Sequence, residues 1–415
     1  MYTKSKQADK IVQDKLDLII PHIMKNIPGV LSLILFGGYG RGEGAYEKVS
    51  NKIRLVNDFD MYVICEKQVD DSILNKVAHE CSRMIGAGGM EWPDFFEEGY
   101  DFNKFFHVDI HCLSLRRLKY LPPLSRYVDI KKAKVLAGKD LSYFINIDEK
   151  RLPVAEGIRI LVNRMMAMFL SFKPEFLDRK LSDDEKRALN YYIAKAYISC
   201  AESLLIFGQE YVVGYELRAK KFNEIYKIKF LDLYSKFPDL GQKVKKFTDY
   251  KIVPNPKDVN SLKEWFECQK RIVGVYDYIT NKLTNGDKLE KYYYDDYASY
   301  VLDKVNLNFL LFRKLLVFLL QGYLSMRYIS RLRNEIGRFY FRAFGLRDPG
   351  MNIIKATSLV LGSLDNKGGY DQKKLSDALN LIRGVFPVKI IDLTWEQVKS
   401  NYLKAYRTYF LQRFV

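Results

Sequence analysis

The chain has 415 residues, of which 48% are hydrophobic and 14% aromatic, and it carries a formal net charge of +17. This length predicts about two or three domains, and the apolar content excludes a chain that is disordered throughout. The charge favours polyanionic partners such as NTPs, nucleic acid or an anionic membrane surface, and it agrees equally well with an ordinary solvated surface.

The cysteines and the apolar stretches restrict the class of protein further. Five cysteines are widely spaced without a CxxC motif, which argues against a disulfide framework and a zinc site. The first ten residues are polar and have no apolar leader, so the sequence predicts a cytoplasmic protein. Arg313 and Lys314 interrupt the most apolar stretch, 309–326. The remainder, 315–326, is shorter than the roughly 20 residues that cross a bilayer and predicts a buried helix.

The first 150 residues alternate between helical and strand patterns. Their predicted elements are a helix at 8–26, a strand at 30–36, a glycine loop at 37–44, a polar hairpin or loop insertion at 45–57, a strand at 58–66, a helix at 69–85, a strand at 105–113 and a short strand near 131–140. This order predicts an N-terminal α+β domain with a small mixed sheet flanked by helices.

The pattern becomes mainly helical after Leu152 and Pro153. Long helical periodicities cover 154–172, 184–208 and 259–285, and a linker with two prolines lies at 251–260. The segment after residue 290 is aromatic, basic and mainly helical. We therefore predict three domains, at 1–150, 151–285 and 286–415.

Three acidic residues stand in two of the predicted strands. Asp58 and Asp60 are separated by one residue, so their side chains project from the same face of a strand. Asp109 lies at the centre of another apolar strand, where a carboxylate is costly unless a cation or a hydrogen-bond donor meets it. Magnesium prefers such oxygen ligands, and two magnesium ions support many phosphoryl transfer reactions.

The glycine loop supplies a second feature of a phosphate site. Gly37 and Gly38 expose backbone N–H groups that can approach a phosphate closely, and Arg41 offers a fork of donors that matches phosphate oxygens. Together, the acids and the loop predict a site for an NTP with magnesium.

These segments resemble the DNA polymerase β-like nucleotidyltransferase superfamily, and the glycine loop resembles its minimal nucleotidyltransferases. The matching segments are LILFGGYGRG (33–42), NDFDMYV (57–63) and HVDIH (107–111). Two departures are the 19 residues between Gly38 and Asp58, which require an insertion, and glycine at position 38, where many members have serine. Chains with similar loops and a helical tail are also associated with surface-glycan genes.

The resemblance implies a role for each matching residue. Asp58, Asp60 and Asp109 would bind two magnesium ions, and Asp109 would also orient or deprotonate the acceptor. Gly37 and Gly38 would contact the NTP phosphates, with Arg41 as a further contact.

Other interpretations of the same residues remain open. Residues 40–45 fit a GxGxxA dinucleotide turn, with Glu66 as its ribose-binding acid, but this turn needs a helix directly after the glycines. No Lys-Ser/Thr follows them, which disfavours a P-loop. The acids could instead face solvent or cap turns. His107 and His111 share the face of Asp109, where they could line the site, hydrogen-bond locally or bind zinc, whereas Cys112 would point into the core.

The segment 311–347 is strongly basic and contains interleaved aromatic residues. It could stack nucleic-acid bases, rest on anionic lipid, or form an ordinary helix with solvated arginines. Its basic residues are Arg313, Lys314, Arg327, Arg331, Arg333, Arg338, Arg342 and Arg347.

The sequence thus predicts a magnesium-dependent nucleotidyltransferase. It would transfer NMP from an NTP to an acceptor in RNA, protein or a small metabolite, and pyrophosphate would leave. A non-catalytic nucleotide- or RNA-binding module and a membrane-surface protein of a glycan pathway are the two alternatives. The sequence does not specify the oligomeric state.

Overall fold

The computed structural model describes residues 1–49, 52–87, 106–255, 259–284, 350–388, 390 and 392–409, together with the single positions 289, 315 and 319. The strands are β1 (Val30–Leu35), β2 (Tyr46–Val49), β3 (Lys52–Leu55), β4 (Asp58–Cys65), β5 (His107–Ser114) and β6 (Lys134–Gly138). The helices are α1 (Lys6–Asn26), α2 (Gly37–Gly40), α3 (Asp71–Met84), α5 (Ser125–Lys131), α6 (Val154–Ser171), α7 (Asp183–Phe207), α8 (Tyr215–Lys229), α9 (Leu231–Lys236), α10 (Leu240–Ile252), α11 (Ser261–Thr284), α15 (Gly350–Ser363), α16 (Gln372–Arg383) and α17 (Trp395–Tyr409).

The chain divides into two compact units, neither of which is continuous in sequence. Unit 1 contains residues 1–152 and 181–259, and unit 2 contains residues 153–180 and 260–415. Unit 1 therefore joins the α/β residues to helices α7 to α10. This grouping differs from the three consecutive ranges predicted above.

A four-stranded mixed sheet lies at the centre of the α/β part of unit 1. Its strand order is β5-β4-β1-β6, in which β1 pairs antiparallel with β4 and β6, and β4 pairs parallel with β5. Strands β2 and β3 form a separate hairpin. The expected small mixed sheet flanked by helices is present.

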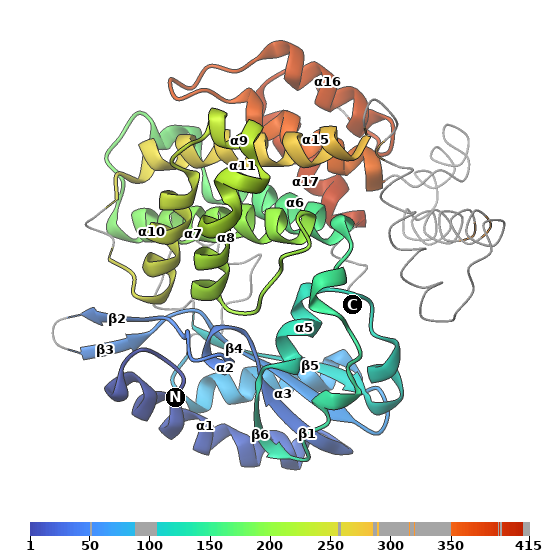
Figure 1. The fold of residues 1–415 in the computed structure, drawn as a ribbon. Helices are drawn as coiled ribbons and strands as arrows, with labels where there is room; N and C mark the ends of the chain where they lie inside the picture. The colour runs from blue at the N-terminus through green and yellow to red at the C-terminus, as the bar shows by residue number, and fades with distance from the viewer. Residues whose placement is uncertain are drawn as a thin grey trace. The chain divides into compact units, whose positions relative to one another are not determined.

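Helices α1 and α3 cover one face of this sheet (Figure 1). Helix α1 buries Val12, Leu16, Ile19 and Ile23, whose spacing of three to four residues places them on one side of the helix. Ser5 begins the helix, because its side chain accepts a hydrogen bond from the N–H of Ala8. The apolar side of α1 packs against one face of the sheet. The opposite face of the sheet carries the acids.

Helix α7 is the longest helix of unit 1 and begins at a complete capping box. The side chain of Ser182 accepts from the N–H of Glu185, whose carboxylate accepts from the N–H of Ser182. The helix ends at Gly208, as the sequence predicts. Tyr197 of α7 stacks on Phe247 of α10 with ring centroids 4.9 Å apart, which holds these two helices together.

The described part of unit 2 contains helices α6, α11 and α15 to α17, a short 3-10 helix (Pro174–Phe176) and an isolated β-bridge at Leu364 and Tyr370. Its core is aromatic, since Phe172 stacks on Trp265 at 4.3 Å and meets the edge of Trp395 at 6.2 Å. The expected helical character after residue 150 is thus confirmed for the described residues.

Several local expectations can be compared with the structure. The hairpin at 45–57 is confirmed, whereas the prediction that 37–44 contains no regular structure is wrong, because Gly37–Gly40 form one helical turn. The basic segment 311–347 lies outside the described residues except for Leu315 and Leu319, which leaves its function untested. All five cysteines are free. Within the described ranges, no helix is long and apolar enough to span a membrane.

Candidate active site

The register of two parallel strands brings the three predicted acids together. Asp60 of β4 lies opposite Asp109 of β5, and Asp58 lies opposite His107. Side chains alternate along a strand, so the neighbouring Phe59 points into the core behind the sheet. The acids therefore share the face that α1 and α3 do not cover.

The electrostatics of Asp60 and Asp109 differ. Burial, followed by the like charges of Asp58 and Asp109, raises the pKa of Asp60 well above its ordinary value. Burial also acts to raise the pKa of Asp109, but a hydrogen bond from His111 and the charges of His111 and His107 lower it overall. Nε2 of His111 is 3.2 Å from Oδ2 of Asp109. His111 thus takes a local hydrogen-bonding role, one of the alternatives left open above.

The fit of these acids to a divalent cation can be judged from the same contacts. The charges of Asp58 and Asp109 help to raise the pKa of Asp60, so a cation beside this carboxylate would be favourable, and carboxylate oxygens are the ligands that magnesium prefers. In the described residues, however, no three His, Cys, Asp or Glu side chains are gathered closely enough to hold a metal ion. The donors suit magnesium in chemistry and strand position, but their side chains are not gathered around one point in this structure.

The predicted glycine turn lies directly beside Asp60. The N–H of Phe36 donates to the carbonyl of Asp60 at 3.0 Å, which ties the end of β1 to β4. Gly37 has a φ of +67°, and a Cβ at this position would overlap Oδ2 of Asp60. Only glycine therefore lets the start of the turn approach this carboxylate.

Gly38 closes the turn onto the following loop. Its carbonyl accepts a hydrogen bond of 2.8 Å from the N–H of Glu43. A Cβ at Gly38 would lie 3.1 Å from the carbonyl oxygen of Glu43, tighter than an ordinary contact. A side chain at position 38, such as the serine of many members of the resembled family, would require the carbonyl of Glu43 to shift by a few tenths of an ångström.

The long spacing between the glycines and Asp58 is taken up by the hairpin β2–β3. The N–H of Val56 donates to the carbonyl of Ala45 at 2.9 Å, so the hairpin starts and ends at one place. The buried hydroxyl of Tyr39 donates to both carbonyls, at 2.6 Å from Ala45 and 3.0 Å from Val56. The insertion leaves the glycine turn beside Asp60, and it also excludes the helix that a dinucleotide turn would need here.

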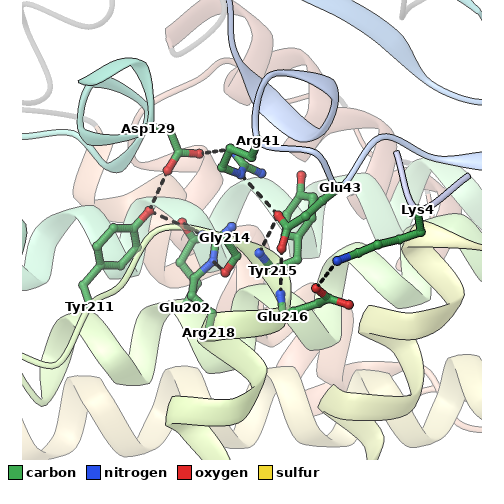
Figure 2. Close-up of polar contacts among 10 residues, drawn as sticks. All are labelled: Lys4, Arg41, Glu43, Asp129, Glu202, Tyr211, Gly214, Tyr215, Glu216 and Arg218. Carbon is green, nitrogen blue, oxygen red and sulfur yellow. Dashed lines mark hydrogen bonds and ion pairs between the residues drawn. The ribbon is translucent and has the colours of Figure 1, made fainter. Parts of the chain in front are cut away.

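Arg41 does not extend into open space. It ion-pairs with Asp129 of α5, and its Nε lies 3.3 Å from Oε2 of Glu43 (Figure 2). The guanidinium also lies 4.7 Å from the ring centroid of Tyr215, and only 5% of the side chain is exposed. The structure therefore gives Arg41 partners within the protein, and its contact with a phosphate stays a prediction.

Glu43 links the glycine loop to the helical part of unit 1. Its carboxylate accepts from the N–H of Tyr215 at 2.8 Å and from the N–H of Glu216 at 2.9 Å, the first two residues of α8 (Figure 2). These N–H groups have no partner within the helix, and the carboxylate also offsets the positive end of its dipole. Glu43 thus fixes the start of α8 to the glycine loop.

The network continues behind Asp129. The hydroxyl of Tyr211 donates to Asp129 at 3.3 Å and lies 3.4 Å from NH1 of Arg218. Arg218 in turn pairs with Glu202 of α7 at 2.5 Å. Two arginines (Arg41 and Arg218) therefore alternate with three carboxylates (Glu43, Asp129 and Glu202) in this buried network, so each charge has an opposite charge beside it.

Sequence reasoning did not identify Glu43, Asp129 or Arg218 as site-positioning residues. Glu43 lies inside the GGYGRGEG motif, two residues after Arg41, and this neighbouring opposite charge could have indicated that the two side chains pair. Asp129 and Arg218 carry no such signal, because their pairing depends on contacts between distant segments.

Comparison with protein-family models, curated proteins and solved structures finds no match to this chain. The functional argument therefore depends on the geometry described above.

Proposed function

We propose that unit 1 is a magnesium-dependent nucleotidyltransferase of the polymerase β-like type. It transfers NMP from an NTP to an acceptor hydroxyl or phosphate and releases pyrophosphate. The observation that carries this proposal is the register of Asp60 against Asp109, with Asp58 on the same face and Gly37 in contact with Asp60. This arrangement combines clustered oxygen donors with a turn free of side chains, as nucleotidyl transfer requires.

Each residue has a distinct role in the proposed reaction. Bound magnesium would neutralise the triphosphate and hold its reacting oxygens in line. Asp58, Asp60 and Asp109 are the residues that would hold it. Asp109, whose pKa is lowered, accepts the proton of the acceptor hydroxyl. The acceptor oxygen then forms a bond to the α-phosphorus as the bond to the bridging oxygen of pyrophosphate breaks.

The direct test replaces the acids and measures NTP consumption. Purified full-length protein is incubated with each NTP, magnesium and a cell extract as the source of acceptor, and pyrophosphate release is recorded. Asp58→Ala and Asp60→Ala should each abolish magnesium-dependent release while circular dichroism stays unchanged. Asp17→Ala, at an exposed residue of α1, is the matched control and should retain activity.

Two outcomes would separate this proposal from its alternative. Magnesium-dependent NTP consumption that persists in the Asp58→Ala/Asp60→Ala double variant refutes the catalytic assignment. NTP binding by the wild type in calorimetry without turnover under any condition supports the non-catalytic nucleotide-binding module in its place.

A further inference from the structure

Two short 3-10 helices of unit 1 present tyrosine rings to solvent. They are η2 (Leu115–Tyr120), which directly follows β5, and η3 (Ser142–Phe144). Tyr120 ends η2 and is 79% exposed, and Tyr143 of η3 is 68% exposed. Because an exposed ring gains free energy when another surface covers it, these two tyrosines are available for contact with a ligand.

A lysine connects the two 3-10 helices. Nζ of Lys119 in η2 lies 5.4 Å from the ring centroid of Phe144 in η3. The ring centroid of Tyr143 lies 4.3 Å from that of Phe144. An ammonium group and two rings therefore follow one another across what we call the η2–η3 surface, which comprises the exposed residues of these two helices.

The three-residue period of η2 places further cations on this surface. Side chains three positions apart lie one above the other in a 3-10 helix, so Arg117 lies beside Tyr120 and Arg116 lies beside Lys119. The remaining row faces the protein, because Leu118 at its centre is fully buried. Helix η2 thus directs two rows that contain cations outward and one apolar row inward.

The positive charge of η2 is not neutralised by the described part of the protein. Arg116, Arg117 and Lys119 are exposed, and none of them forms an ion pair with another described residue. The sequence has no Asp or Glu from 110 to 128. A surface with uncompensated cations favours a polyanionic partner.

The kind of side chain that is exposed favours a nucleic acid over a membrane. A surface that binds a membrane places apolar side chains in the lipid, but the aliphatic residues Leu118, Leu141 and Ile145 are at most 7% exposed. Tyrosine rings beside unpaired cations are typical of proteins that stack on the bases of a single strand and contact its phosphates. A duplex fits less well, because its bases are already stacked on one another.

We propose that the η2–η3 surface binds single-stranded nucleic acid. Tyr120 and Tyr143 stack on bases, and Arg116 and Arg117 contact phosphates. This surface is separate from the acids, because Asp109 lies five residues before the end of β5, about 17 Å along the strand. The binding therefore goes beyond the proposed function and needs neither NTP nor magnesium.

The tyrosines are tested by the binding of a fluorescein-labelled oligonucleotide to the full-length protein, measured by anisotropy without NTP or magnesium. Oligo(U) and oligo(dT) of about 12 nucleotides, a length within the usual range of single-strand sites, distinguish RNA from DNA. Tyr120→Ala and Tyr143→Ala should each weaken binding by about fivefold or more, which is the effect of losing one base–aromatic stack. Tyr120→Phe and Tyr143→Phe keep the ring and should keep the affinity.

The arginines are tested by the salt dependence of the same binding. The double variant Arg116→Gln/Arg117→Gln should reduce the slope of the logarithm of affinity against the logarithm of salt concentration by about 1.4, since each phosphate contact with a single strand contributes about 0.7. The matched control is Lys6→Gln/Lys10→Gln, which removes the same charge from two exposed lysines of α1 and should leave slope and affinity unchanged. All the substituted side chains are exposed, so circular dichroism should show intact folds.

The comparison between variants decides the question, because the full chain also contains the basic segment 311–347. Tyrosine and arginine variants that bind with the affinity and the salt slope of the wild type overturn the inference, as does a wild type that binds neither oligonucleotide. An equal loss in the lysine control also overturns it, because binding would then follow net charge alone.

Two further arms test the class of partner. Binding of a duplex of the same length with equal affinity overturns the assignment to a single strand. Sedimentation with phosphatidylserine vesicles that depends on Tyr120 and Tyr143, without oligonucleotide binding, overturns the nucleic-acid assignment in favour of a membrane.

Discussion

Asp60 and Asp109 lie in register on adjacent parallel strands, and the pKa of one carboxyl is raised while that of the other is lowered. Burial and two like charges act on Asp60, whereas His111 donates a hydrogen bond to Asp109. Divergent environments of this kind let two neighbouring carboxyls take different roles. In the proposed reaction, Asp109 is ionised and accepts a proton, and Asp60 becomes ionised where a cation offsets its neighbours.

Replacement of Gly37 by alanine should destabilise the protein and displace Asp60. Its left-handed φ alone costs about 1–2 kcal/mol for alanine, and the overlap with the Asp60 carboxylate adds to this. Gly86→Ala is a matched control, because Gly86 has a φ of +66° and open space at the Cβ position. Urea unfolding should show a larger loss for Gly37→Ala, with loss of activity in that variant alone. Equal losses with full activity would show that the turn tolerates a side chain.

Replacement of Glu43 by alanine should loosen the start of α8. The change removes the acceptor for two N–H groups and leaves Arg41 with Asp129, so we expect a loss of about 2–3 kcal/mol in the free energy of unfolding. Amide exchange at Tyr215 should become faster. The control, Glu216→Ala, removes an exposed pair with Lys4 and should cost less than about 1 kcal/mol. If the two substitutions lower the free energy of unfolding by the same amount, Glu43 does not anchor the start of α8.

The stability of unit 2 should rise with pH above 8 because of Lys399. Burial lowers the pKa of this lysine to about 8, against an unfolded value of about 10.4. Between these values the unfolded chain binds the extra proton, so the free energy of unfolding increases with pH, by up to about 3 kcal/mol in total. Below pH 8 both states are protonated, and this contribution is flat.

Denaturant unfolding of the wild type and Lys399→Met at pH 7 to 10 checks this prediction. The variant should lose the slope between pH 8 and 10. It also leaves the carbonyl of Phe172, which accepts from Nζ of Lys399 at 2.9 Å, without this donor, but that cost is the same at every pH. Parallel pH curves for the two proteins would contradict the assignment.

Cys112 should be the most reactive of the five thiols. A hydrogen bond from Cys65 is the main cause that lowers the pKa of Cys112 to about 7, with help from the N–H of Val69, and the side chain is partly exposed. Its alkylation rate should therefore rise with pH to a plateau above about 8. Cys65→Val removes the donor and should slow the reaction at pH 7 several-fold. Peptide mapping by mass spectrometry measures both, and preferential labelling of Cys81 would contradict the prediction.

The acids and the hairpin could be predicted from sequence because their signals are local. Alternation along a strand places Asp58 and Asp60 on one face without knowledge of the rest of the chain. The contacts of Arg41 with Asp129 and of Glu43 with Tyr215 span 88 and 172 residues, and no periodicity encodes such pairings. The sequence therefore indicated a phosphate contact for Arg41 and gave no sign of its ion pairs with Asp129 and Glu43.

The discontinuity of unit 1 has a consequence for biosynthesis. Residues 1–152 leave the ribosome before the helices at 181–259 that complete their unit, with a segment of unit 2 in between. At a typical synthesis rate, this delay lasts about 5 to 20 seconds. During that interval Glu43 lacks the amides of α8, and Asp129 lacks Tyr211. An expressed fragment that ends at residue 150 would lack these contacts permanently.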